Sequence, residues 1–292
     1  MRPLPRFRLH RPGSIAEALG LLSSLDDAKP IAGGTDLVPL LRDVERGPRN
    51  LVCVGQLGAL SYLREEDGMV TIGATTTLSR LLESDTIKRR AQGLHDAVYR
   101  MGSVQIRNLG TIGGNLCNAS PAADTAPPLL VLDSDVTVAS EGESRTMPLA
   151  DFFVGPKISS LKPYELLTEV RFPAQQRSSG SAFHRIGRRK GFTLSVVSAA
   201  AYIERDGEYC RRARIALGSV APTPIRVPEA EGELEGKEVT EALFEDIGVV
   251  CRDHIHPIDD VRGSASYRKG VSGVLVNRAL KDAWIRAGGE LI

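Results

Sequence analysis

The chain has 292 residues, of which 42% are hydrophobic and 25% are charged, close to average globular usage. The 37 basic residues balance 36 acidic ones, so the net charge of +1 favours neither nucleic acid nor an anionic membrane as a partner. This composition excludes a disordered or fibrous protein, and the length suffices for one large domain or two ordinary ones.

The apolar runs of the chain are short. The longest, PPLLVL at 127–132 and VVSAAAYI at 196–203, fall well below the ~20 residues that span a bilayer. The arginine-rich start, MRPLPRFRLHRPGS, lacks the apolar segment of a signal peptide. We therefore expect a cytoplasmic protein with no membrane span.

The first elements form a small α/β pattern. Ser14, with Glu17 three residues later, predicts a capped amphipathic helix over IAEALGLLSSL. A short strand, AKPI, then leads through a glycine pair to a second helix with leucines at helical spacing. LVCVGQL at 51–57 reads as a further strand. This unit is expected to end near residue 58.

The next stretch mixes helices and strands. Residues 69–84 predict a strand and then a helix capped near Thr77 or Ser79, and a longer helix is expected over 88–102. From 127 to 153 apolar and polar residues alternate as in strands, with turns at DSD and EGES. ELLTEVRFP at 165–173 reads as a strand that Pro173 ends.

A polar, glycine-containing segment, QQRSSGS at 175–181, marks the best domain boundary. Beyond it we expect strands with a hairpin at RDGE (205–208), followed by a mostly helical tail from 241 to 287. The predicted organisation is a first domain over 1–176, with subdomains of about 1–58 and 59–176, and a smaller α+β domain over 177–292.

Cysteine and histidine spacing bears on metals. Cys53, Cys117, Cys210 and Cys251 lie far apart, which argues against a structural zinc or an iron–sulfur cluster within this chain. The pair His254 and His256 could share one face of a strand and hold a metal, although a solvated loop is the simpler interpretation. No metal site is predicted.

Two glycine segments resemble each other, AGGTD at 32–36 and TIGGN at 111–115. Paired glycines let a backbone approach a ligand closely and leave successive N–H groups pointing outward, which suits phosphate oxygens. Each pair is alternatively a mere tight turn. Neither segment is GxGxxG or GxxxxGK[ST], so a Rossmann dehydrogenase and a P-loop ATPase are disfavoured.

Four stretches carry a resemblance: HRPGSIAEAL, KPIAGGTDLVPLL, IRNLGTIGGNLCNASPAADTAPPLLVLD and LLTEVRFP. Over about residues 7–280 the chain resembles the FAD-binding medium subunit of the molybdenum hydroxylases, a family that includes carbon monoxide and xanthine dehydrogenases. The resemblance implies an α+β fold, in which a two-subdomain FAD-binding domain of the PCMH type precedes a smaller α+β domain.

By similarity, two segments and three further positions bind FAD. The first segment supplies main-chain donors to the diphosphate, the second takes its other side, and Asp124 holds the adenosine end; Met101 or Gly102 and Leu167 lie nearer the rings. The residues implied are Pro30, Ile31, Ala32, Gly33, Gly34, Thr35, Asp36, Leu37, Met101, Gly102, Thr111, Ile112, Gly113, Gly114, Asn115, Asp124 and Leu167. Asp124 is alternatively a helix N-cap.

Two places in the sequence bear on which basic residue could supply a positive charge near the flavin. Arg188, Arg189 and Lys190 lie where the family has a basic segment, which is equally well a solvated surface. A lysine that contacts flavin in some relatives aligns near Ser195, which cannot supply that charge. Cys117, beside the second segment, is expected to have a packing role.

The implied function is electron transfer. Electrons would pass from a molybdenum cofactor on a large partner subunit, through two [2Fe–2S] clusters on a small one, to FAD on this chain and on to an external acceptor. A dimer of such heterotrimers is expected, and no residue here need act as nucleophile or general acid. The alternatives are a stand-alone flavin-dependent oxidase or dehydrogenase and a flavin-free scaffold subunit.

Overall fold

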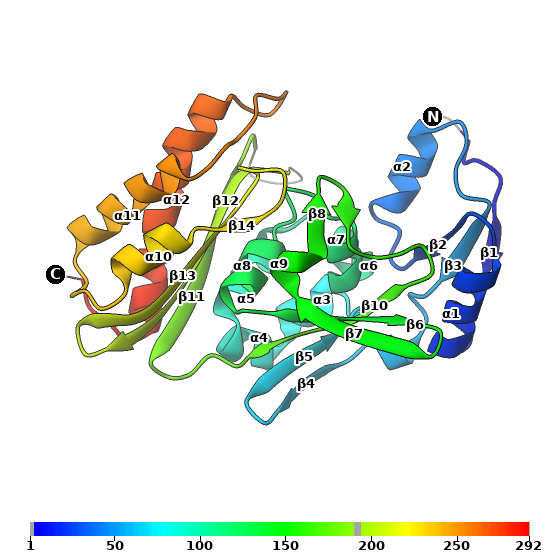
Figure 1. The fold of residues 1–292 in the computed structure, drawn as a ribbon, viewed down its shortest axis with the longest axis horizontal. Coiled ribbons are helices and arrows are strands. Elements are labelled where there is room, and N and C mark those ends of the chain that lie inside the picture. Colours follow the sequence, from blue (N-terminus) through cyan, green and yellow to red (C-terminus); the bar gives the residue numbers. More distant parts are fainter. Residues whose placement is uncertain (1–2, 190–193, 292) are drawn as a thin grey trace.

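The computed structural model describes residues 3–189 and 194–291, which form three units in chain order along the long axis of the molecule (Figure 1). Among these residues, no helix combines the length and the apolar character needed to cross a bilayer.

The N-terminal unit is a parallel three-stranded sheet of order β1-β3-β2 with helices against it. Ser14 caps the first helix as predicted, since its hydroxyl accepts from the Glu17 amide. The strand expected over 51–57 is shorter and ends at Cys53. The elements are β1 (Arg8–His10), α1 (Ile15–Ser24), β2 (Ala28–Ile31), α2 (Leu37–Asp43), β3 (Asn50–Cys53) and the 3-10 helix η1 (Gly58–Leu60).

The middle unit is an antiparallel sheet of order β4-β5-β10-β6-β7, packed against several short helices. Its strands are β4 (Leu63–Glu66), β5 (Met69–Gly73), β6 (Asp135–Ser140), β7 (Glu143–Pro148) and β10 (Leu166–Pro173), with a small pair β8 (Phe153–Gly155) and β9 (Ile158–Ser159). Its helices are α3 (Leu78–Glu83), α4 (Asp85–Arg90), α5 (Gln92–Arg100), α6 (Val104–Leu109), α7 (Ile112–Cys117), α8 (Ala126–Val131) and α9 (Leu149–Phe152).

Two expectations for this unit are wrong. The helix predicted over 88–102 is two helices, α4 and α5, separated at Ala91. The run PPLLVL at 127–132, expected to alternate as a strand, lies in the helix α8 except for its last residue. All six residues of α8 are buried. Proline is tolerated in the first turn of a helix, where its missing N–H would have had no partner, so Pro127 and Pro128 do not prevent the helix that begins at Ala126.

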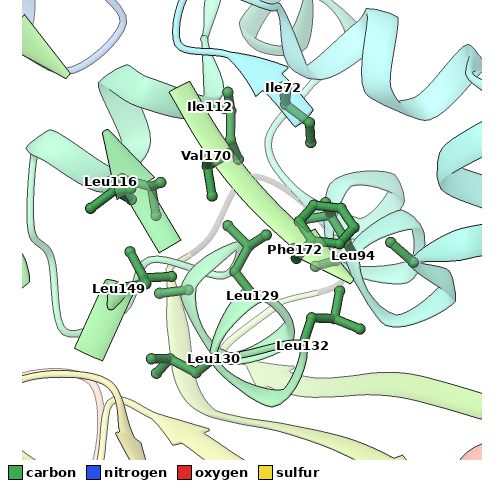
Figure 2. Packing of buried hydrophobic residues seen from close by; sticks show 14 of the residues in the cluster. Ile72, Leu94, Ile112, Leu116, Leu129, Leu130, Leu132, Leu149, Val170 and Phe172 are labelled. Carbon is green, nitrogen blue, oxygen red and sulfur yellow. The ribbon is translucent and has the colours of Figure 1, made fainter. Parts of the chain in front are cut away.

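The core of the middle unit joins its helices to the sheet. Figure 2 shows Ile112 and Leu116 of α7 beside Val170 of β10, with Leu129 of α8 below them. Leu166, one strand position before Leu167, packs instead into the core of the N-terminal unit. Strand β10 therefore ties the first two units together.

The C-terminal unit is an antiparallel sheet of order β11-β12-β13-β14, with the last three helices on its outer face (Figure 1). The hairpin predicted at 205–208 is confirmed. The helical tail is confirmed over α11 and α12, with a loop at 254–264 between them. The elements are β11 (Ser179–Gly187), β12 (Ser195–Asp206), β13 (Tyr209–Gly218), β14 (Ile225–Arg226), α10 (Pro228–Leu234), α11 (Glu241–Asp253) and α12 (Ala265–Arg286).

Strand β12 is buried on both faces. Ala199, Ala201 and Ile203 pack into the core shared with the last helices, whereas Ala200 and Tyr202 pack into the core of the middle unit. This double burial explains why its sequence is a continuous apolar run and does not alternate.

Candidate functional site

The first glycine segment lies against the two residues that precede the second segment. A Cβ atom on Gly33 would lie only 1.8 Å from the carbonyl oxygen of Leu109 and 3.1 Å from the amide nitrogen of Gly110. A Cβ on Gly110 would in turn lie 3.5 Å from the Thr35 hydroxyl oxygen. The fold thus brings the β2–α2 connection and the α6–α7 connection into backbone contact, which only glycine at position 33 permits.

The first segment has unpaired donors. In the described part of the chain, the amides of Ala32, Gly33, Gly34 and Thr35 donate no hydrogen bond to another protein atom. Gly34 adopts a positive φ of 69°, and its carbonyl accepts from Val38 at the start of α2. Successive unpaired N–H groups around a left-handed residue form a concavity suited to anionic oxygens.

The second segment differs from the expectation. It is not a bare loop but the N-cap and first turn of α7, and the amides of residues 112–115 donate to acceptors inside the protein. Ile112 donates to the Thr76 carbonyl at 3.0 Å, Gly113 to the Ala74 carbonyl at 2.9 Å and Gly114 to the Thr111 hydroxyl at 3.1 Å. The two glycine segments are therefore not equivalent donors.

Close packing explains the glycine at 113. A Cβ there would lie 2.6 Å from the Cβ of Ala74, so the residue lets α7 pack against the end of β5. The side chain of Asn115 remains as a polar group of this segment. Its Oδ1 accepts from the Thr125 hydroxyl at 2.6 Å, which leaves the NH2 group to donate elsewhere.

Asp124 is buried, and both of its carboxylate oxygens accept hydrogen bonds from protein side chains. Its side chain is 5% exposed, and it accepts from the Arg185 guanidinium on β11 and from the Ser195 hydroxyl on β12, the latter at 2.5 Å. Burial raises the pKa of the Asp124 carboxyl, and Arg185 and Ser195 oppose that rise. Thr125 occupies the N-cap position of α8 without a side-chain capping bond, so Asp124 is no N-cap. Asp124 links the middle unit to the C-terminal sheet.

The remaining predicted residues surround these segments at different depths. Pro30 and Ile31 end β2 and Leu37 begins α2, so all three flank the first segment. Met101 follows α5, and its carbonyl accepts from the Arg107 guanidinium at 2.8 Å. Gly102 is exposed with a φ of 51°, and the Leu167 side chain is buried in the core.

A cation that sequence reasoning did not find lies near the first segment. Lys157, in the β8–β9 turn, donates from Nζ to Asn118 Oδ1 at 3.0 Å. Burial lowers the pKa of Lys157, Asp36 opposes that change, and Arg262 of the 254–264 loop reinforces it. No sequence pattern marks this lysine, because the charges that act on it come from distant parts of the chain.

The basic run at 188–190 is one sequence-based candidate for a positive charge near the flavin. Arg188 donates to the Val261 carbonyl at 2.9 Å and so holds the 254–264 loop, whereas Lys190 lies outside the described residues. Ser195 donates to Asp124 and supplies no charge. Burial raises the pKa of Cys117 to about 12, so its thiol is protonated at neutral pH, in keeping with a packing role.

The described residues contain no group of three or more histidine, cysteine, aspartate and glutamate side chains able to hold a metal. His254 follows α11 in a loop, where its Nδ1 lies 2.9 Å from the Val250 carbonyl oxygen, so the pair His254 and His256 does not share a strand face.

Comparison with known proteins agrees with this geometry. The model of the FAD-binding domain in molybdopterin dehydrogenase matches residues 5–175, and that of the CO dehydrogenase flavoprotein C-terminal domain matches residues 181–283. The chain belongs to the molybdopterin dehydrogenase flavoprotein family. Its first domain is thus an FAD-binding domain, and the α+β fold class predicted from sequence is confirmed.

Relatives of this flavoprotein match over nearly their whole length. The carbon monoxide dehydrogenase medium chain of Hydrogenophaga pseudoflava is 32% identical over 97% of this chain and 98% of its own. The putative xanthine dehydrogenase FAD-binding subunit of Escherichia coli is 31% identical over 97% of each chain. The solved carbon monoxide dehydrogenase of Hydrogenophaga pseudoflava superposes with a TM-score of 0.94, over 97% of this chain and 99% of that one.

Proposed function

We propose that this flavoprotein is the electron-transferring subunit of a molybdenum hydroxylase complex. In this proposal a large partner carries the molybdenum cofactor, a small partner carries two [2Fe–2S] clusters, and the complex is a dimer of such heterotrimers. FAD bound to this chain would accept electrons from the clusters and pass them to an external acceptor.

The observation that carries the proposal is the row of unpaired amides at residues 32–35, set in backbone contact with Leu109 and Gly110, which directly precede the second glycine segment. An anionic diphosphate fits this concavity, because partly exposed N–H groups without a protein partner are available to donate to its oxygens. Ala32, Gly33, Gly34 and Thr35 would hold the diphosphate, and Asn115 would donate from the opposite segment. Full-length similarity to medium chains of such dehydrogenases supports the same proposal.

The residues of this chain would position the cofactor and exclude water from it. We assign none of them a bond-making role, and the half-buried Cys117, whose pKa is raised to about 12, is unsuited to nucleophilic chemistry at neutral pH. The adenosine end is less well supported, since both oxygens of Asp124 already accept hydrogen bonds from Arg185 and Ser195.

Purification of the chain from its native cells tests the proposal. We expect visible flavin absorption, one FAD per chain, and two co-purifying subunits that contain molybdenum and iron. Isolation of a flavin-free chain, or of a complex without molybdenum, contradicts the proposal. Substrate turnover by the flavin-loaded chain alone would indicate a stand-alone enzyme.

A further inference from the structure

The β8–β9 turn holds Lys157 in a defined position. Its backbone adopts a φ of 64°, and its amide donates to the Ala119 carbonyl at 2.9 Å. The side chain reaches Asn118 Oδ1 at 3.0 Å. Both acceptors directly follow α7, so the lysine is fixed to the helix that bears the second glycine segment.

The charge of Lys157 has no close carboxylate. Within residues 3–189 and 194–291, no carboxylate oxygen lies within 4.0 Å of its Nζ, and the hydrogen bond of the ammonium group goes to the neutral amide oxygen of Asn118. The charges of Asp36, in the first glycine segment, and of Arg262, in the loop before α12, both act on Lys157. Arg262 Nη1 lies 3.5 Å from the Asp260 carboxylate, so its charge is already partly neutralised.

The exposed carboxylate of Asp36 opposes anion binding at the first glycine segment. Its carboxylate ends the segment whose amides are unpaired, and it would repel a diphosphate bound to them. A nearby ammonium group offsets that repulsion and adds a charge-assisted hydrogen bond. The charge of Asp36 acts on Lys157, whose Nζ the Asn118 side chain holds at 3.0 Å.

We propose that Lys157 supplies the positive charge that faces the FAD diphosphate, and that Asn118 positions it. This inference rests on the proposed function, because it requires the cofactor to bind at the first glycine segment. It adds a diphosphate ligand from the β8–β9 turn, a part of the chain outside both glycine segments.

The test is a titration of the flavin-free full chain with FAD, with ADP-ribose and with riboflavin. Lys157→Met should weaken FAD and ADP-ribose, which share the diphosphate, by about 10- to 100-fold, and should leave riboflavin unchanged. Lys88→Met removes only an exposed ion pair on α4 and serves as the matched control. Unchanged ADP-ribose affinity in Lys157→Met, or a loss confined to riboflavin, overturns the inference.

A second variant removes the charge without removing the lysine. Asn118→Asp would place a carboxylate 3.0 Å from Nζ and neutralise it, so it should weaken ADP-ribose as Lys157→Met does. Lys157→Arg should retain most of the affinity. Tight ADP-ribose binding by Asn118→Asp contradicts the inference even if Lys157→Met folds poorly.

Dependence on pH gives a further readout. Since burial lowers the pKa of Lys157, ADP-ribose affinity should fall as the pH rises through the alkaline range, and Lys157→Met should abolish that dependence. Failure of the wild-type chain to bind FAD would refute the proposed function itself. Wild-type binding with an unaffected Lys157→Met variant would refute only the role of Lys157.

Discussion

Arg286 at the end of α12 donates to Asp96 on α5, with Nη1 2.6 Å from Oδ2 and Nη2 3.2 Å from Oδ1. The same carboxylate accepts from the Phe183 amide of β11 at 3.3 Å. Asp96 thereby joins the middle unit to both the sheet and the last helix of the C-terminal unit.

Asp96→Asn should therefore lower the free energy of unfolding by about 1–3 kcal/mol, because two charge-assisted bonds are lost at a half-buried site. Urea denaturation measures the change. Asp85→Asn breaks an exposed pair with Lys88 and should cost under about 1 kcal/mol. Equal losses of unfolding free energy in the two variants would show that the Asp96 pair stabilises the fold no more than the exposed Asp85 pair does.

Gly33→Ala should separate the two glycine segments, since its Cβ would collide with the Leu109 carbonyl. We expect loss of FAD retention and a destabilisation of about 1–3 kcal/mol from the overpacking. Gly20→Ala is the matched control, because Gly20 lies within α1 of the same unit and its Cβ would meet open space. Normal FAD content in purified Gly33→Ala would show that segment contact is dispensable.

Asp124→Asn separates two roles for this carboxylate. If Asp124 links the units, the variant loses about 3–5 kcal/mol of stability, because the buried Arg185 guanidinium loses the carboxylate it faces. If Asp124 instead binds the adenosine ribose, FAD affinity falls while stability holds. The geometry favours the first outcome, and parallel denaturation and FAD titration decide between the two.

The ion pair between Glu165 and Arg145 is expected to be sensitive to acid. Although burial alone raises the pKa of this carboxyl, Arg145, which donates twice, and the Lys162 amide hold it below its ordinary value. A lowered carboxyl pKa stabilises the fold above the unfolded-state value and loses that contribution as the pH falls through the folded-state value. Glu165→Gln should lower stability at pH 7 and flatten the pH dependence below about pH 4.5. An unchanged acid profile would contradict this.

Local signals in the sequence were sufficient for several elements. The caps at Ser14 and Thr77 and the hairpin at 205–208 depend on neighbouring residues alone, so they were predictable. Helix α8 was missed because an apolar run buried on all sides has no helical periodicity to read.

The candidate site was predictable only where its chemistry lies in one segment. The glycine pair at 33 and 34 is visible in the sequence, whereas the hydrogen bond that occupies the Gly113 amide goes to the carbonyl of Ala74, just after β5, and depends on tertiary packing. Lys157 is likewise invisible in the sequence, since its partner Asn118 and the charges of Asp36 and Arg262 come from three other segments.

The double burial of β12 has a consequence for separating the domains. If residues 181–283 were expressed alone, one face of their sheet would expose apolar side chains to water. These include Phe183, Ala200, Tyr202 and Ala216. Such a fragment should aggregate on expression. By burying one face of the C-terminal sheet, the FAD-binding domain thus also keeps the C-terminal domain soluble.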